Sequence, residues 1–239
     1  ISRLPGFVQI VWNTLSISLY SLAVSFPMPI LLALVINEIK ASGFRRSVQT
    51  ISYAPHFISV VVLISMVEMF VNPEYGMINR ILGLFGASPI PFLSEPRYFK
   101  SLYVLSGVWQ SSGWGAIVYL SALSGIDPQL HESAMIDGAN RIQRIAHINL
   151  PGILPTVSLL FILQVGGLMS VGFEKAFLMQ KNINLEVSEV ISTYVYKQGL
   201  LQLQYSFSSA VGLFNSVINC LLLVITNTIT RSLGGNSLF

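Results

Sequence analysis

Ionisable side chains gather in one polar stretch, residues 131–151 (HESAMIDGANRIQRIAHINLP), of a chain that is otherwise apolar. Two acids within it, Glu132 and Asp137, are the types that perform general acid and base chemistry. No nucleophile or metal-ligand cluster accompanies them, so the pattern does not indicate catalysis. We expect a docking element instead, and spacing alone leaves open the alternative of a solvated connecting helix.

The local sequence predicts that this stretch folds as a short helical hairpin. An Asp-Pro pair at 127–128 is typical of a helix start, because the carboxylate caps free amides and proline fits the first turn. Asp137 and Arg141 have the i, i+4 spacing of an ion pair on one helix face. Gly138 allows a close approach or a left-handed turn between two short helices, and Pro151 is expected to end the second helix.

The rest of the chain has the composition of an integral membrane protein. Apolar residues make up 53% of the 239 residues and charged residues only 10%, whereas soluble proteins carry about 25% charged residues. Several segments without any charged residue exceed the roughly 20 residues that a membrane-spanning helix needs. These segments are 4–37, 47–67, 101–126, 145–173 and 198–230.

These segments predict five membrane-spanning helices in this chain. The first is expected to be kinked at Pro27 and Pro29. A sixth helix is expected upstream, since the chain begins at Ile1 without a methionine. The basic residues Lys40, Arg45 and Arg46 favour a cytoplasmic position for the loop after the first helix. The predicted spans are 4–37, 48–70, 101–124, 152–173 and 207–230, with external loops at about 71–100 and 174–206 and an internal loop at about 127–151.

Charge and cysteine content exclude several other classes of function. The net charge of +3 gives a pI of 9.1, which basic membrane-protein loops explain without a nucleic-acid partner. The single cysteine, Cys220, lies in an apolar run, so neither a disulfide framework nor a metal site is indicated.

The hairpin carries a specific family resemblance. The triplets Glu132–Ala134 and Asp137–Ala139, followed by Ile148, Leu150 and Pro151, resemble the EAA loop of permease subunits of binding-protein-dependent ABC importers. Ser133 replaces the usual alanine and Ile145 replaces a common aromatic residue. The stretches WNTLSISLYSLAVSFPMPILLALVINE, FRRSVQTISYAPHFIS and YGMINRILG are similar to the sugar-transporter branch, which imports oligosaccharides derived from complex polysaccharides.

The resemblance implies an all-α, polytopic transmembrane bundle of the type I importer class, with residues 1–239 as a single permease domain. It implies partners: a second homologous permease, two ATP-binding ABC subunits, an extracytoplasmic solute-binding protein and the lipid bilayer of a bacterial cytoplasmic membrane. The EAA helix would sit in a cleft of the ATPase. The residues expected to couple to the ATPase are Glu132, Ser133, Ala134, Asp137, Gly138, Ala139, Arg141, Leu150 and Pro151.

The chain itself has no GxxxxGK[ST] phosphate loop, so ATP and Mg²⁺ are expected to act through the partner ATPases and this subunit is expected not to be an enzyme. Aromatic and polar side chains in the spans are candidates for the sugar path. For each of them packing, an interfacial position or a contact between helices remains open. The candidates are Glu68, Gln110, Trp114, Tyr119 and Gln164.

Other transport functions remain as alternatives. An ABC permease for another solute, such as amino acids, would share the hairpin. A secondary transporter driven by an ion gradient would need a midplane ionisable pair or matched broken helices, and the charge-free spans offer neither. A membrane scaffold would bind partners through the same hairpin without moving a substrate.

Overall fold

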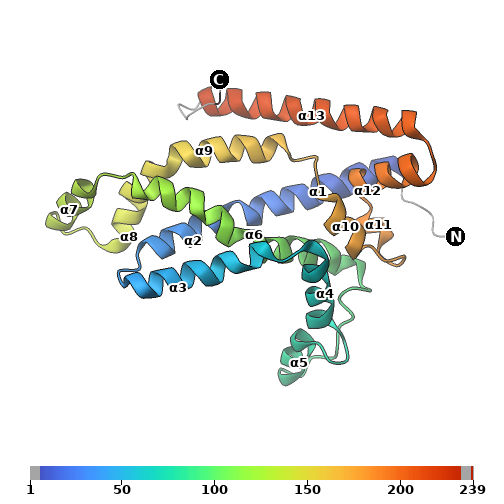
Figure 1. The fold of residues 1–239 in the computed structure, drawn as a ribbon, viewed down its shortest axis with the longest axis horizontal. Helices are drawn as coiled ribbons and strands as arrows, with labels where there is room; N and C mark the ends of the chain where they lie inside the picture. The colour runs from blue at the N-terminus through green and yellow to red at the C-terminus, as the bar shows by residue number, and fades with distance from the viewer. Residues whose placement is uncertain (1–5, 233–237, 239) are drawn as a thin grey trace. The chain divides into compact units, whose positions relative to one another are not determined.

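The computed structural model describes residues 6–232 and 238, and the regular structure within these residues is helical throughout (Figure 1). The predicted all-α class is therefore confirmed. In chain order the elements are α1 (Phe7–Ser25), α2 (Pro27–Asn37), α3 (Ser42–Tyr53), the 3₁₀ turn η1 (Ala54–Phe57), α4 (Val60–Val71), α5 (Met77–Leu84), α6 (Pro96–Ser124), α7 (Pro128–Ile136), α8 (Arg141–Arg144), the π-helix η2 (Ile145–Asn149), α9 (Leu150–Gly166), α10 (Phe173–Met179), α11 (Leu185–Ser188), α12 (Ile191–Tyr196), the π-helix η3 (Lys197–Leu201) and α13 (Tyr205–Ser232).

Some of the helices in the described residues are long and apolar enough to cross a membrane. Three stretches meet this requirement alone, and a fourth crossing results if one bent helix pair counts as a single span. They are Phe7–Asn37, Arg141–Gly166 and Tyr205–Ser232, with Ser42–Phe57 and Val60–Val71 as the bent pair. The first span breaks at Phe26 between α1 and α2, where the prolines of the SFPMPI sequence predicted a kink.

The predicted span 101–124 lies in α6, which is long enough to cross but more polar than the other spans. Its serines are largely satisfied inside the helix. The hydroxyl groups of Ser106, Ser112 and Ser124 each donate to the carbonyl oxygen four residues earlier. A helix whose polar groups are paired in this way can lie within a membrane bundle.

The chain divides into two compact units that each combine distant parts of the sequence. Unit 1 comprises residues 1–23, 58–107 and 167–220, and unit 2 comprises residues 24–57, 108–166 and 221–239. The helices α1, α6 and α13 each contribute residues to both units. The single permease domain inferred from the sequence stays a prediction.

Unit 2 has an apolar core built by α2, α6 and α9. Close helix approach depends on missing side chains: Gly113 lies against the backbone of Ser52, and a Cβ at Gly115 would lie 3.1 Å from the Pro29 side chain. The buried residues of this core are Ala33, Leu34, Ile36, Ala116, Tyr119, Leu120, Leu123 and Ile153.

Unit 1 contains the segment 58–107, in which one asparagine fixes the position of α5. Asn79 is 6% exposed. Its amide donates to the carbonyl oxygens of Val71 at 3.1 Å and Ile90 at 3.0 Å, and its oxygen accepts from the Ile90 amide at 2.8 Å. The predicted external loop 71–100 is therefore an ordered structure around a helix.

The second predicted span, 48–70, is wrong as one straight helix. The chain bends by 103° between Ser42–Phe57 and Val60–Val71. Pro55 has no amide hydrogen to continue the α-helical bonding, and the chain tightens there into η1. Ser59 then starts α4, since its hydroxyl accepts from the Val62 amide.

The C-terminal end of the fourth predicted span, 152–173, is wrong. The helix α9 stops at Gly166, seven residues early. The side chain of Asn219 replaces helical hydrogen bonds beyond this end. Its oxygen accepts from the Met169 amide at 3.0 Å, and its amide donates to Ser170 Oγ at 2.9 Å.

Candidate functional site

The predicted hairpin joins the end of α6 to the start of α9 within unit 2 (Figure 1). Asp127 caps α7, as predicted, by accepting from the Gln129 amide at 2.9 Å. Gly138 adopts φ +81°, the left-handed turn that glycine allows. The helix α8 begins with a capping box in which Asn140 and Gln143 exchange hydrogen bonds at 2.8 and 2.9 Å. This cap was not predicted, although the N-x-x-Q spacing of Asn140 and Gln143 indicates one.

One expected feature of the hairpin is absent. No ion pair joins Asp137 to Arg141 among the described residues. The helix α7 ends at Ile136, and the turn at Gly138 separates the two charges into different elements. The i, i+4 rule holds only along a continuous helix, so both charges stay available to a partner.

The hairpin exposes most of the motif that the sequence identified. Ala134, Ala139 and Ile148 are half-buried, whereas the other motif residues are exposed. Large apolar side chains between them are also exposed, with Ile136 at 86% and Ile142 at 77%. The exposed motif residues are Glu132, Ser133, Asp137, Gly138, Arg141, Leu150 and Pro151.

Pro151 does not end the second short helix, contrary to expectation. The chain passes from α8 through η2 into α9 without interruption. The Leu150 amide bonds to the carbonyl oxygen of Ile145, five residues back. This widened π turn accommodates the proline, which lacks an amide hydrogen. The hairpin is consequently continuous with a membrane-spanning helix.

Asn149 lies in this π turn and is fully buried. Neither its side-chain oxygen nor its nitrogen has a hydrogen-bond partner among the described residues. An unpaired buried amide costs about 1–3 kcal/mol. This residue was not among the predicted site residues, and it is an unsatisfied polar group at the base of the hairpin.

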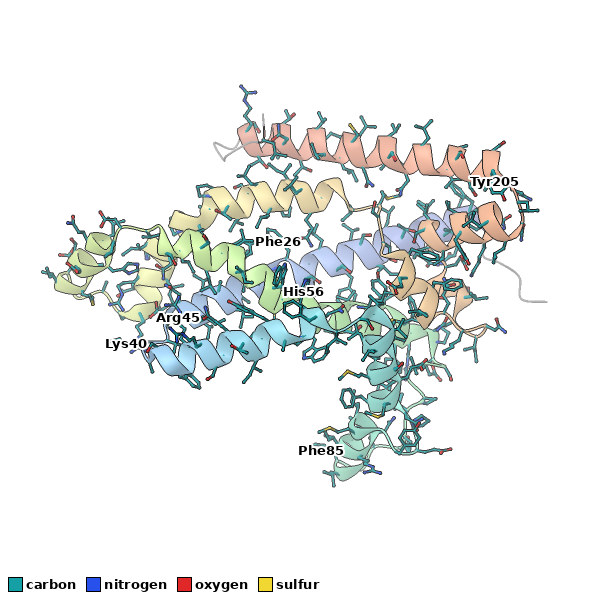
Figure 2. The ribbon with its side chains drawn as sticks, viewed as in Figure 1. Phe26, Lys40, Arg45, His56, Phe85 and Tyr205 are labelled. Atoms are coloured by element: carbon teal, nitrogen blue, oxygen red, sulfur yellow. The ribbon has the colours of Figure 1, made fainter. Side chains whose placement is uncertain are left out.

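Basic side chains lie toward the same end of unit 2 as the hairpin. Figure 2 labels Lys40 and Arg45 near the turn from α2 to α3. Lys40 is exposed and Arg45 is half-buried. The cytoplasmic position of both segments, for which the enrichment of cytoplasmic loops in basic residues was the argument, stays a prediction.

Glu68, a predicted substrate-path residue, lines a cavity in unit 1. The cavity has a volume of about 610 Å³, and its lining includes Ser65, Tyr75 and Ser94. Glu68 pairs with Lys181 at 2.8 Å, and the two side chains are 39% and 48% exposed. The pairing of Glu68 with a lysine from the predicted loop 174–206 was not visible in the sequence.

Trp114 lies at the surface of unit 2 in an aromatic group. Its ring stacks on the His56 ring with centroids 4.5 Å apart and planes 5° apart, and Phe57 meets it edge-on at 5.8 Å. Trp114 remains 46% exposed, so one face of the indole can meet another molecule. His56, labelled in Figure 2, supports Trp114.

The remaining substrate-path candidates have different surroundings. Tyr119 is 3% exposed and belongs to the apolar core of unit 2. Gln110 is half-buried, whereas Gln164 on α9 is exposed. The structure thus does not bring the five candidates into a common cavity within either unit, and their role in the path stays a prediction.

A buried polar network in unit 1 lies within the predicted external loop 174–206. Glu189 is fully buried. Its carboxylate accepts from Thr193 Oγ1 at 2.9 Å and from Lys197 Nζ at 2.5 Å. Lys197 also donates to Gln180, and Asn13 from α1 donates to the Glu189 carbonyl oxygen at 3.1 Å. The network fixes the shape of this segment, and sequence analysis did not find it.

The described residues contain no group of three or more His, Cys, Asp or Glu side chains that could hold a metal ion. The hairpin presents carboxylates, a guanidinium group and apolar side chains instead. Chemically it can dock to a protein surface.

Comparisons with known proteins agree with this picture. The family described as binding-protein-dependent transport system inner membrane component matches residues 25–234. The polygalacturonan/rhamnogalacturonan transport system permease protein YteP of Bacillus subtilis is 39% identical over 235 residues, which cover 98% of this chain and 73% of that protein.

Solved structures show the same fold. A bacterial ABC transporter that imports the acidic polysaccharide alginate contains a chain 42% identical, with a TM-score of 0.91 over 95% of this chain and 79% of that one. The bacterial alginate transporter in complex with an alginate pentasaccharide-bound periplasmic protein gives a TM-score of 0.93 at 40% identity, over 97% of this chain and 81% of that one.

Proposed function

The chain belongs to the family of binding-protein-dependent transport system inner membrane components, and we propose that it is the permease subunit of an ATP-driven importer of oligosaccharides released from polysaccharides. The relatives named for polygalacturonan, rhamnogalacturonan and alginate support this substrate class. We place the protein in a bacterial cytoplasmic membrane as a multi-pass subunit.

The observation that carries the proposal is the exposed hairpin that continues into α9. Its Glu132 and Arg141 have no ion-pair partner in the described part of the chain, and its left-handed turn at Gly138 is open on the outside. Groups of this kind are available to a protein partner. We assign that partner as one of two ABC ATPases, which would supply ATP and Mg²⁺.

Energy transfer would then be mechanical. Closure of the two ATPases would move this hairpin and that of a second, homologous permease, and α6 and α9 would transmit the movement because they are joined directly to the hairpin. The bundle would alternate between two discrete arrangements, since packed helices shift between states instead of deforming continuously. An extracytoplasmic binding protein would deliver the sugar to the segments 71–100 and 174–206.

The experiment is uptake of trigalacturonate into proteoliposomes that contain this chain, its partner permease, its ATPases and its binding protein. We expect uptake with enclosed ATP and Mg²⁺ even when ionophores collapse all ion gradients. A non-hydrolysable ATP analogue is the control and should abolish uptake. Uptake that follows the ion gradient and ignores ATP would contradict the proposal.

A further inference from the structure

Two lysines of unit 1 differ from their neighbours in having no carboxylate partner. Lys181 pairs with Glu68 at 2.8 Å and Lys197 pairs with Glu189 at 2.5 Å. Lys100 and Lys175 are half-buried, yet no ion pair forms on either one within the described residues. A partly desolvated ammonium group without a counter-ion is costly unless something else supplies the negative charge.

Lys100 lies on one face of α6, and Lys175 of α10 contacts the same face. The spacing i, i+3 and i+7 places three residues of α6 along a single stripe of that helix: Lys100, Tyr103 and Gly107. Lys175 reaches this stripe from α10, where its Nζ donates to the Tyr103 carbonyl oxygen at 2.7 Å. It also lies 4.7 Å from the centre of the Tyr103 ring.

The backbone at Gly107 leaves room for the Lys175 ammonium. A Cβ at this position would lie 3.0 Å from Lys175 Nζ. On the same face, Lys100 Nζ donates to Ser16 Oγ from α1 at 2.7 Å. Each ammonium is thus positioned by a neutral oxygen and retains further N–H groups, because an ammonium has three donors.

Burial lowers the pKa of Lys175 from 10.5 to about 8, so this side chain still carries its charge at neutral pH. The carbonyl oxygen and ring of Tyr103 favour the charged form but do not neutralise it. The face therefore combines two fixed positive charges with unused hydrogen-bond donors.

We propose that Lys100 and Lys175 each bind a carboxylate of a uronic-acid-containing oligosaccharide on the α1, α6 and α10 side of unit 1. This rests on the proposed function and narrows its substrate class to acidic oligosaccharides. A carboxylate fits because it accepts charge-assisted hydrogen bonds from ammonium groups, and a neutral sugar would leave both charges uncompensated.

The test compares trigalacturonate with its fully methyl-esterified form, which keeps the sugar hydroxyl groups and removes the charges. Uptake is measured in phosphatidylcholine proteoliposomes holding the complete transporter, with binding protein pre-saturated by each ligand. We expect Lys175→Met and Lys100→Met to raise the KM for trigalacturonate about tenfold or more. Uptake of the ester should stay unchanged, and Lys175→Arg should retain most of the trigalacturonate uptake.

Lys40→Met is the control, since Lys40 is an exposed lysine of unit 2, and it should not change the preference between the two ligands. Equal losses for both ligands in Lys175→Met would show a merely structural lysine and overturn the inference. An effect that appears only when phosphatidylglycerol is added would assign the lysines to lipid and also overturn it.

Comparing the KM values of the wild-type transporter for the acid and the ester tests the carboxylate site even if the variants do not assemble. A wild-type transporter that takes up acid and ester with the same KM contradicts the carboxylate site while leaving the proposed function intact. A wild-type transporter that takes up neither saccharide, nor any neutral oligosaccharide, contradicts the proposed function itself.

Discussion

The hairpin 127–151 and the segment 173–201 are both polar insertions between apolar helices, but they treat their charges in opposite ways. In the hairpin, Glu132 and Asp137 are exposed and form no ion pair among the described residues. In the other segment, Glu189 is fully buried and bonded to both Lys197 and Thr193. The charged groups of the hairpin are therefore available to a partner protein, whereas those of the segment 173–201 are paired within the chain.

The proposed function needs both kinds of segment, a hairpin whose charges can dock to a partner and a second polar segment that keeps a fixed shape. Exposed charges contribute little to folding, because water and salt screen them. A buried charge pair, in contrast, makes the fold depend on each member. We therefore expect substitutions in the hairpin to change coupling with little change in stability, and substitutions in the network to do the reverse.

The largest effect on stability is expected from Glu189→Ala. This change leaves Lys197 and Thr193 without their acceptor, at a cost of about 3–5 kcal/mol for an uncompensated buried charge. The thermal unfolding midpoint of the detergent-purified transporter should fall clearly. A double variant, Glu189→Gln with Lys197→Met, removes both charges and should recover part of the loss. A midpoint unchanged in Glu189→Ala would show that the network does not hold the segment.

The largest effect on transport is expected from Gly138→Asp in the hairpin. Gly138 and Gly86 both have φ +81° and both have open space where a Cβ would be added. The same substitution at either position therefore introduces the same charge and similar backbone strain, about 1–2 kcal/mol. Only Gly138 lies in the hairpin proposed to dock into an ATPase, where an unpaired charge opposes association.

We accordingly expect Gly138→Asp to reduce uptake by about tenfold or more through lost coupling, with the chain still inserted in the membrane. Gly86→Asp should keep a normal amount of co-purified ATPase, because Gly86 lies outside the hairpin. Gly138→Asn separates charge from shape, because asparagine has the size of aspartate and the same tolerance of the left-handed conformation but no charge, and its uptake should be intermediate. Normal uptake and a normal amount of co-purified ATPase in Gly138→Asp would contradict the docking role of the hairpin.

Sequence analysis predicted the hairpin better than the network because the hairpin is specified by local signals. The cap at Asp127 and the turn at Gly138 depend on a few adjacent residues. The pair of Glu189 and Lys197 is eight residues apart and forms only after the chain turns into α12. Periodicity along one helix cannot find such a pair.

The boundaries of the spans show the same limit. Charge-free length located all the long helices, but it did not reveal the 103° bend before α4. Nor did it reveal the end of α9 at Gly166, where Asn219 satisfies the Met169 amide from a distant part of the sequence. A side chain that replaces a helical hydrogen bond is a tertiary effect, so hydropathy alone cannot predict it.

A smaller gain in stability is expected from Asn149→Leu at the base of the hairpin. The Asn149 amide is buried without a partner in the described part of the chain, so an apolar side chain of similar size should stabilise this state by about 1 kcal/mol or more. The thermal unfolding midpoint should rise. If Asn149 finds a partner in the other transport state, uptake should fall in the same variant. A lower midpoint would show that Asn149 is satisfied in the assembled transporter.

The smallest effect is expected at the pair of Glu68 and Lys181, which has the same chemistry as the buried pair but is exposed. A double-mutant cycle with Glu68→Gln and Lys181→Met should give a coupling free energy below about 1 kcal/mol, decreasing with added KCl. The corresponding cycle at Glu189 and Lys197 should give several times more, with little salt dependence. Because the two pairs differ mainly in burial, similar couplings would mean that burial does not explain the contrast between the two polar segments.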